Sequence, residues 1–233
     1  MKKLLPYSIL LNLIFLVLFG YFILIKKDGL NYLKNKIFNP VKEPLNSHLY
    51  QTKLNVFSSM PILEGSIIFL GDSITEFCNW GELFGQNNII NRGISGDTLD
   101  GILSRIDEII ERKPKKLFLM IGINDLGKGK NTDQILEKYT LLIHKIHTNL
   151  PETIIYIQSV LPAKRKTLSN IDIKNINIGL LNITEKYHIN YIDLHSSFLS
   201  KTNELSDNYS LDGLHLNGEG YLLWKKIIAE YVE

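Results

Sequence analysis

Four short polar stretches end or follow apolar runs of the chain, and together they contain the groups that a serine nucleophile needs. A hydroxyl is a weak nucleophile, so it depends on a base, on an acid that orients this base, and on donors for the oxyanion. Serine, histidine, aspartate and asparagine residues in these stretches could fill the roles. The stretches are Gly71 to Ser73, Asn91 to Gly96, Gly122 to Asp125, and Asp212 to His215.

Ser73 is the predicted nucleophile because it follows the apolar run 66–70, which is typical of a buried strand. Open α/β sheets present reactive groups at the carboxyl ends of their strands. Gly71 permits a close approach of the backbone, and we expect Asp72 to support the turn without reacting. Taken alone, the triplet fits a turn followed by a helix cap. The other three stretches favour the catalytic interpretation.

His215 is the predicted general base, since a neutral imidazole can take the Ser73 proton and return it to the leaving alcohol near neutral pH. Asp212 stands shortly before it in the chain and would hold the other ring nitrogen as a donor. The same stretch also fits a turn before the last helix, with Asn217 as the helix cap.

A second histidine offers an alternative base. Asp193 and His195 alternate with Leu194 at the end of an apolar run, so the two polar side chains could share one face of a strand. A triad through His195 is therefore a minor alternative to one through His215.

In this order and at these separations, the four stretches resemble the four sequence blocks of the SGNH hydrolases, also called the GDSL esterase/lipase family. The resemblance covers residues 60–230. Residues 71–75, 91–98 and 212–217 resemble especially the branch that contains platelet-activating-factor acetylhydrolase-like enzymes and bacterial carbohydrate acetylesterases. The Gly-x-Ser-x-Gly elbow of the α/β-hydrolases is absent around Ser73, which sets that rival family aside.

The resemblance implies a catalytic triad of Ser73, Asp212 and His215. It also assigns the oxyanion hole to the backbone N–H groups of Ser73 and Gly93 and to the side-chain amide of Asn124. An uncharged asparagine can donate to an oxyanion that an aspartate would repel. A turn with a helix cap would explain the stretch around Asn124 alone, but not its occurrence with the other three.

Short apolar runs rich in isoleucine alternate with helical stretches, as in buried parallel strands joined by crossover helices. This pattern predicts an α/β fold, a three-layer α/β/α sandwich with a five-stranded parallel sheet, in agreement with the flavodoxin-like architecture that the resemblance implies. The expected strands are 66–70, 88–91, 116–121, 153–158 and 189–193, and the expected helices are 46–60, 98–112, 132–149, 171–187 and 218–232.

Residues 4–25 form an uncharged apolar run of about 22 residues between lysine pairs, long enough to cross a bilayer. No small-residue cleavage site follows it, so we expect an uncleaved transmembrane helix and not a signal peptide. The predicted organisation is a membrane anchor over 1–27, a tether over 28–46 and an SGNH hydrolase domain over 47–233. A short basic N-terminus usually stays in the cytoplasm, which would place the catalytic domain outside it.

Composition excludes several other classes of function. A net charge of +2 with scattered lysines gives no case for a nucleic-acid partner. No cofactor or metal is implied, because there is no Gly-x-Gly-x-x-Gly loop, phosphate-binding loop or His/Cys cluster. His144 and His147 are expected to face solvent away from the apolar stripe of their helix. The lone Cys78 is expected to be a small buried residue, and nothing indicates an oligomeric state.

These observations predict a membrane-anchored serine esterase that hydrolyses a carboxylic ester through an acyl-enzyme intermediate. The expected substrate is a small-molecule or glycan ester with a short acyl group, acetyl on a carbohydrate in the first place. An acyltransferase or a lysophospholipase could use the same triad. A catalytically silent surface binding module is the remaining alternative. It predicts a damaged triad, which the chain does not show.

Overall fold

The structure is a computed structural model that describes Asn12 and residues 47–233. The predicted anchor and tether, over 1–27 and 28–46, lie outside the described residues apart from Asn12, and they stay predictions. Within the described residues, no helix is both long enough and apolar enough to cross a membrane. Residues 47–233 belong to the second of two units into which the chain divides, and only this unit is described below.

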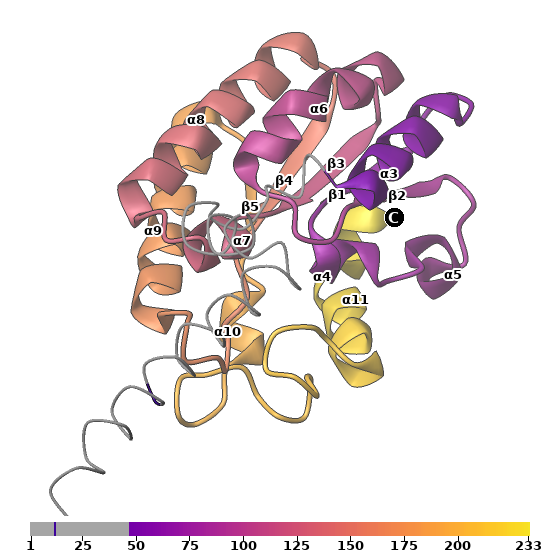
Figure 1. Cartoon of the computed structure of the whole chain (residues 1–233). Helices are drawn as coiled ribbons and strands as arrows, with labels where there is room; N and C mark the ends of the chain where they lie inside the picture. Colours follow the sequence, from indigo (N-terminus) through magenta and orange to yellow (C-terminus); the bar gives the residue numbers. More distant parts are fainter. Residues whose placement is uncertain (1–11, 13–46) are drawn as a thin grey trace, which may run out of the picture. The chain divides into compact units, whose positions relative to one another are not determined.

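A five-stranded parallel sheet runs through this unit in the order β2-β1-β3-β4-β5 (Figure 1). The strands β1 and β3 are buried along their whole length, as expected for apolar strands that are covered on both faces. The predicted strands are confirmed, with small shifts at their ends. They are β1 (Ile67–Gly71), β2 (Ile89–Gly93), β3 (Lys116–Met120), β4 (Ile154–Gln158) and β5 (Asn190–Ile192).

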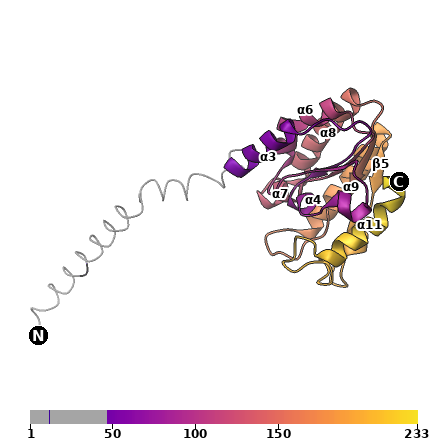
Figure 2. The ribbon, with the colours of Figure 1, turned by 90° about the vertical axis from the view of Figure 1, so that its right-hand side faces the viewer.

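Helices lie on both faces of the sheet, which confirms the predicted α/β/α layers (Figure 2). The helices α6, α8 and α9 pack side by side, and α11 lies across the sheet from α6 and α8. The helices are α3 (His48–Ser59), α4 (Ser73–Glu76), α5 (Trp80–Phe84), α6 (Leu99–Arg112), α7 (Ile123–Gly127), α8 (Thr132–Asn149), α9 (Asn170–Tyr187), α10 (His195–Phe198) and α11 (Gly218–Val232).

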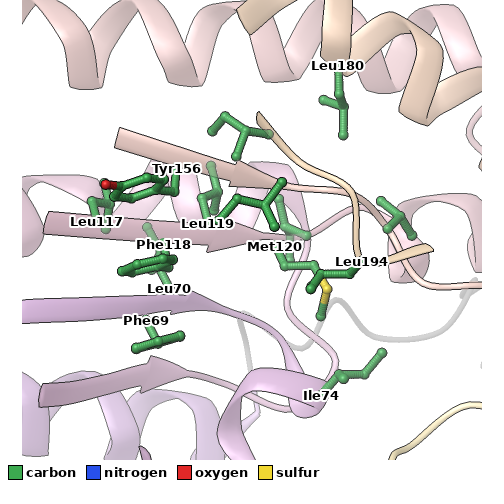
Figure 3. Packing of buried hydrophobic residues seen from close by; sticks show 14 of the residues in the cluster. Phe69, Leu70, Ile74, Leu117, Phe118, Leu119, Met120, Tyr156, Leu180 and Leu194 are labelled. Atoms are coloured by element: carbon green, nitrogen blue, oxygen red, sulfur yellow. The ribbon is translucent and has the colours of Figure 1, made fainter. Parts of the chain in front are cut away.

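A ladder of stacked aromatic rings crosses one face of the sheet. Phe69, Phe118 and Tyr156 occupy matching register positions on β1, β3 and β4, with ring centroids 4.8 and 4.6 Å apart (Figure 3). Trp80 of α5 stacks on Phe69 at 4.1 Å, and Trp224 of α11 packs edge-on against Trp80. Aromatic contacts add to the burial of the rings, so the ladder fixes α5 and α11 on the same face.

The apolar stripe predicted on α8 faces the core, whereas His144 and His147 are exposed and lie beside the ring of Tyr187. Tyr139 from the stripe donates its hydroxyl to the carbonyl of Ile121 (2.6 Å) and accepts the N–H of the same residue (3.1 Å). This contact fixes the chain where it leaves β3 for the third polar stretch. The other members of the stripe are Ile135, Leu142, Ile146 and Leu150.

Replacing Phe118 by alanine should lower the free energy of unfolding by about 3–5 kcal/mol, because it leaves a cavity between two stacked rings. Leu141 on α8 is 51% exposed, so Leu141→Ala is the control and should change the same quantity by less than about 1 kcal/mol. Urea denaturation of both variants measures the difference. Equal effects would show that the ring ladder is not a main contributor to the core.

Candidate active site

The structure brings the predicted nucleophile, base and acid together. Ser73 is the first residue of α4, directly after the turn that ends β1, and its Oγ lies 3.0 Å from Nε2 of His215. Nδ1 of His215 lies 2.7 Å from Oδ2 of Asp212. His215 and Asp212 come from the loop before α11, whose first turn is capped by Asn217 as predicted. The arrangement can move a proton from a hydroxyl to an imidazole that a carboxylate orients.

Asp212 is held as an ionised acceptor. Its Oδ1 accepts the backbone N–H groups of Leu214 (2.9 Å) and His215 (2.8 Å). Partial burial acts to raise the pKa of Asp212, but the hydrogen bonds from the side chain and backbone of His215 and from Leu214 outweigh it and hold this pKa well below its usual range. An ionised carboxylate only accepts hydrogen bonds, so Nδ1 of His215 carries a proton and Nε2 faces the Ser73 hydroxyl as the acceptor.

Asp72 supports the turn, as the sequence predicts. Its buried carboxylate caps α4 by accepting the N–H of Ile74 at 2.9 Å. Burial raises the pKa of Asp72 to about 7, and the negative charges of Asp97 and Asp125 act in the same direction. In the described part of the chain, its side chain forms no hydrogen bond with His215, whose Nδ1 faces Asp212.

Two glycines let α4 approach the sheet closely. A Cβ atom on Gly71 would lie 2.2 Å from Oγ1 of Thr75, and one on Gly93 would lie 2.3 Å from the backbone nitrogen of Glu76. Such distances are far below van der Waals contact, so neither position accepts a side chain without movement of the backbone. The role of Gly93 at the end of β2 is therefore steric.

The predicted use of Gly93 as an oxyanion donor needs correction. Its N–H donates to Oδ1 of Asn91 at 2.8 Å, so this donor is already engaged. Gly96, later in the same loop, has a φ of +76° that favours glycine, and its N–H has no acceptor within residues 47–233. The side chain of Asn124 donates to the carbonyl of Asp97, the residue after Gly96, at 3.0 Å. Its second N–H has no acceptor among residues 47–233 and could donate to an oxyanion.

The loop that carries Gly96 is tied to the helix that begins with Ser73. Glu76, in α4, accepts the backbone N–H of Ser95 at 2.6 Å and forms an ion pair with Lys53 of α3 at 2.7 Å. The hydroxyl of Ser95 donates to the same carboxylate. The nucleophile and the candidate oxyanion donor are therefore positioned through one carboxylate.

The sequence pattern of the GDSL-like Lipase/Acylhydrolase family matches residues 69–223. The chain belongs to this family. The human platelet-activating factor acetylhydrolase IB subunit alpha2 is 27% identical over 179 residues, which cover 72% of this chain and 76% of that protein. The N-acylneuraminate cytidylyltransferase of Streptococcus agalactiae serotype III (strain NEM316) is 30% identical over 159 residues, which cover 67% of this chain and 36% of that protein.

A solved structure from Streptococcus pneumonia is 28% identical to the chain and superposes with a TM-score of 0.74, covering 89% of this chain and 100% of that one. The family and these neighbours make the protein an ester-hydrolysing serine hydrolase, with the α/β fold that the structure shows.

A buried ion pair in the acylhydrolase joins the ends of two strands. Arg105 of α6 contacts Asp97 at 2.8 Å, and their side chains are 4% and 1% exposed. The same guanidinium donates to the carbonyls of Gly71 (3.3 Å) and Arg92 (2.9 Å), near the carboxyl ends of β1 and β2. Tyr50 of α3 donates to Asp97 at 3.2 Å. Burial raises the pKa of Asp97, and the positive charge of Arg105 opposes this rise.

The alternative triad through His195 is wrong. His195 begins α10 and does not end a strand, and its Nε2 is buried without a hydrogen-bond partner in the described structure. The carboxylate of Asp193 accepts the backbone N–H of Ser196 at 3.1 Å and its hydroxyl. The histidine at the Ser73 hydroxyl is His215.

The remaining candidates for chemistry outside the triad have structural explanations. Cys78 is buried, and burial raises the pKa of its thiol to about 12, so it stays protonated and unreactive at neutral pH. The described residues contain no group of three or more histidine, cysteine or acidic side chains that could hold a metal ion.

Asp72→Asn should change how the stability of the acylhydrolase depends on pH. The folded state keeps the Asp72 proton up to pH about 7, whereas the unfolded chain releases it near pH 3.9, so unfolding of the wild type becomes easier as the pH rises through this window. Asparagine has no such proton. Between pH about 4 and about 7.5, the free energy of unfolding of the variant should therefore rise relative to that of the wild type by on the order of 3 kcal/mol.

Urea denaturation at the two pH values measures this difference. Asp107→Asn is the matched control, because Asp107 is 72% exposed in its ion pair with Lys145 and its loss should leave the pH dependence close to that of the wild type. A pH dependence that is the same in Asp72→Asn and in the wild type would contradict the assignment.

Proposed function

We propose that the acylhydrolase removes short acyl groups, acetyl in the first place, from hydroxyl groups of carbohydrates. The observation that carries the proposal is the continuous relay of Ser73, His215 and Asp212, with contacts of 3.0 and 2.7 Å at the end of β1. An intact relay is what an acyl-transfer mechanism needs, and it argues against a catalytically silent binding module.

In this mechanism the Oγ of Ser73 attacks the ester carbonyl carbon while its proton passes to Nε2 of His215. The carbon–oxygen bond to the alcohol then breaks, and His215 gives its proton to the leaving oxygen. Water repeats the sequence on the acyl-Ser73 ester, with His215 as base, and releases the acid. Asp212 orients the imidazole and stabilises its charged form. The N–H groups of Ser73 and Gly96 and the amide of Asn124 receive the oxyanion.

The nature of the acyl and alcohol groups is supported by two relatives and one contact. The human relative is named as a subunit of a platelet-activating factor acetylhydrolase. The Streptococcus agalactiae relative, of which the match covers 36%, is named as an N-acylneuraminate cytidylyltransferase. The ring of Phe77 lies 5.0 Å from the ring of His215 and is 56% exposed. An exposed aromatic face beside the residue that protonates the leaving alcohol suits a sugar ring.

A lysophospholipase is the second candidate function. Leu211 is 92% exposed directly before Asp212, so exposed apolar side chains flank both catalytic loop residues. Large apolar side chains at a site mouth suit a long acyl chain or a lipid surface.

The location of the enzyme is part of the proposal. The uncharged run 4–25 supports a single membrane anchor. The basic stretch before the run, with Lys2 and Lys3, would stay in the cytoplasm and leave the catalytic domain outside it. A domain tethered there would meet esters of extracellular glycans or of the membrane itself.

The full chain should hydrolyse p-nitrophenyl acetate faster than p-nitrophenyl esters of longer acids, and it should release acetate from an acetylated monosaccharide. Ser73→Ala should lower kcat by at least about a thousandfold, since the nucleophile is lost. Asn124→Ala should lower kcat by about a hundredfold or more with little change in KM, since the amide acts on the transition state. Release of p-nitrophenol and of acetate measures both rates.

Leu141→Ala, at the surface of α8, is the control for effects of handling and folding in these assays. Activity that survives Ser73→Ala would exclude Ser73 as the nucleophile. A preference for long-chain esters would contradict the proposed acetylesterase function and favour the lysophospholipase.

A further inference from the structure

The segment that follows β4 contacts the loop that carries the catalytic aspartate. The backbone N–H of Lys164 donates to the carbonyl of Gly213 at 2.7 Å. Gly213 has a φ of +76°, and a Cβ atom there would lie 2.5 Å from the carbonyl oxygen of Lys164. The backbones of Lys164 and Gly213 therefore lie so close together that only a glycine fits at position 213.

Arg165 reaches from this segment to the catalytic carboxylate. Its Nη2 donates to Oδ2 of Asp212 at 2.6 Å, and its Nε donates to the backbone carbonyl of the same residue at 3.2 Å. Oδ2 is also the oxygen that faces Nδ1 of His215. One carboxylate oxygen is thus shared between a permanent guanidinium charge and the imidazole of the general base.

The segment that carries Arg165 is itself held in place by two asparagines of α9. Asn170 accepts the N–H of Ala163 at 2.9 Å and donates to its carbonyl at 2.7 Å. Asn177 makes the same pair of contacts with Val160, at 2.8 and 2.9 Å. Paired amide contacts of this kind replace a missing strand partner, so the segment is held at a set distance from the loop.

We infer that Arg165 is a positioning residue of the acylhydrolase, which holds Asp212 toward His215 and, by sharing its oxygen, limits how strongly the carboxylate stabilises the protonated imidazole. The inference rests on the proposed function for its kinetic part. The side chain of Asp212 is 43% exposed. The N–H groups of Leu214 and His215 hold its Oδ1, and Arg165 adds a hold on Oδ2, the oxygen that faces the imidazole. The guanidinium offers a planar fork to the side chain and the backbone of one residue, which a lysine cannot reproduce.

The charged side chains near the contact between Arg165 and Asp212 provide a matched control variant. Within residues 47–233, the basic side chains that form ion-pair contacts with Asp212 are those of His215 and Arg165. Lys164 and Asp207 form the neighbouring ion pair, with Nζ–O distances of 2.8 and 2.6 Å, and this pair does not include a catalytic residue. Lys164→Gln removes the same charge from the same segment as Arg165→Gln, so it is a matched control.

Proton NMR of the full chain tests the inference without a substrate. The downfield signal of the Nδ1–H of His215 reports its hydrogen bond to Asp212. It should move in Arg165→Gln, because the carboxylate loses a charged donor, and stay in place in Lys164→Gln. A signal that is unchanged in Arg165→Gln, or that moves equally in Lys164→Gln, would overturn the inference, whichever ester the enzyme hydrolyses.

Kinetics on p-nitrophenyl acetate separates charge from position. Arg165→Gln should lower kcat about three- to tenfold, because Asp212 is held less firmly toward His215, and should leave KM close to that of the wild type. The loss is moderate because the contact is partly exposed and screened. The acid limb of the kcat/KM profile should move to higher pH, because the uncompensated Asp212 charge favours the imidazolium. Arg165→Lys should restore the acid limb, but only part of kcat, because it keeps the charge and loses the fork.

A purely structural role for Arg165 would lower the melting temperature and leave the acid limb unmoved, and that result would contradict the inference. Failure of the wild type to hydrolyse any ester, with an NMR signal that moves as expected, would overturn the proposed function and leave the positioning role of Arg165 supported.

Discussion

The buried ion pair of Asp97 and Arg105 is the constraint on which the rest of the site depends. A charge that is taken out of water is stable only if it is paired and hydrogen-bonded, so the two side chains hold each other in one geometry. Nη2 of Arg105 also donates to carbonyls near the ends of β1 and β2, close to the turn that presents Ser73. The amide of Asn124 contacts the backbone of Asp97. The predicted nucleophile and the candidate oxyanion donors are thereby fixed to one buried group.

The second half of the site is built differently, at the surface. Asp212 and His215 lie in a loop before α11, and their geometry comes from local hydrogen bonds to the backbone and from contacts with the segment after β4. Ser73 is thus fixed by buried contacts, whereas the position of His215 depends on contacts that are exposed to solvent and screened by salt. This division explains why the acid and the base of the relay are the parts most open to tuning by a residue such as Arg165.

Much of this arrangement could be predicted from the sequence, because it depends on periodicity and on local order. Buried parallel strands appear as short apolar runs, and a serine at the end of the first of them lies at the edge where ligands bind. The sequence could not separate Gly93 from Gly96 as an oxyanion donor, because the two glycines are three residues apart and the hydrogen bond that engages the N–H of Gly93 is visible only in the structure. Arg165 could not be found, because its contact with Asp212 joins segments that are distant in sequence and leaves no local pattern.

Ser73 is predicted to be the group that the ester acylates, and covalent labelling tests this role most directly. The full chain is treated with a fluorophosphonate, which reacts with activated serines, and is then digested and analysed by mass spectrometry. We predict a single adduct on the peptide that contains Ser73, no adduct in Ser73→Ala, and slower labelling in His215→Ala, where the base is absent. An adduct on another residue, or equal labelling of Ser73→Ala, would contradict the account.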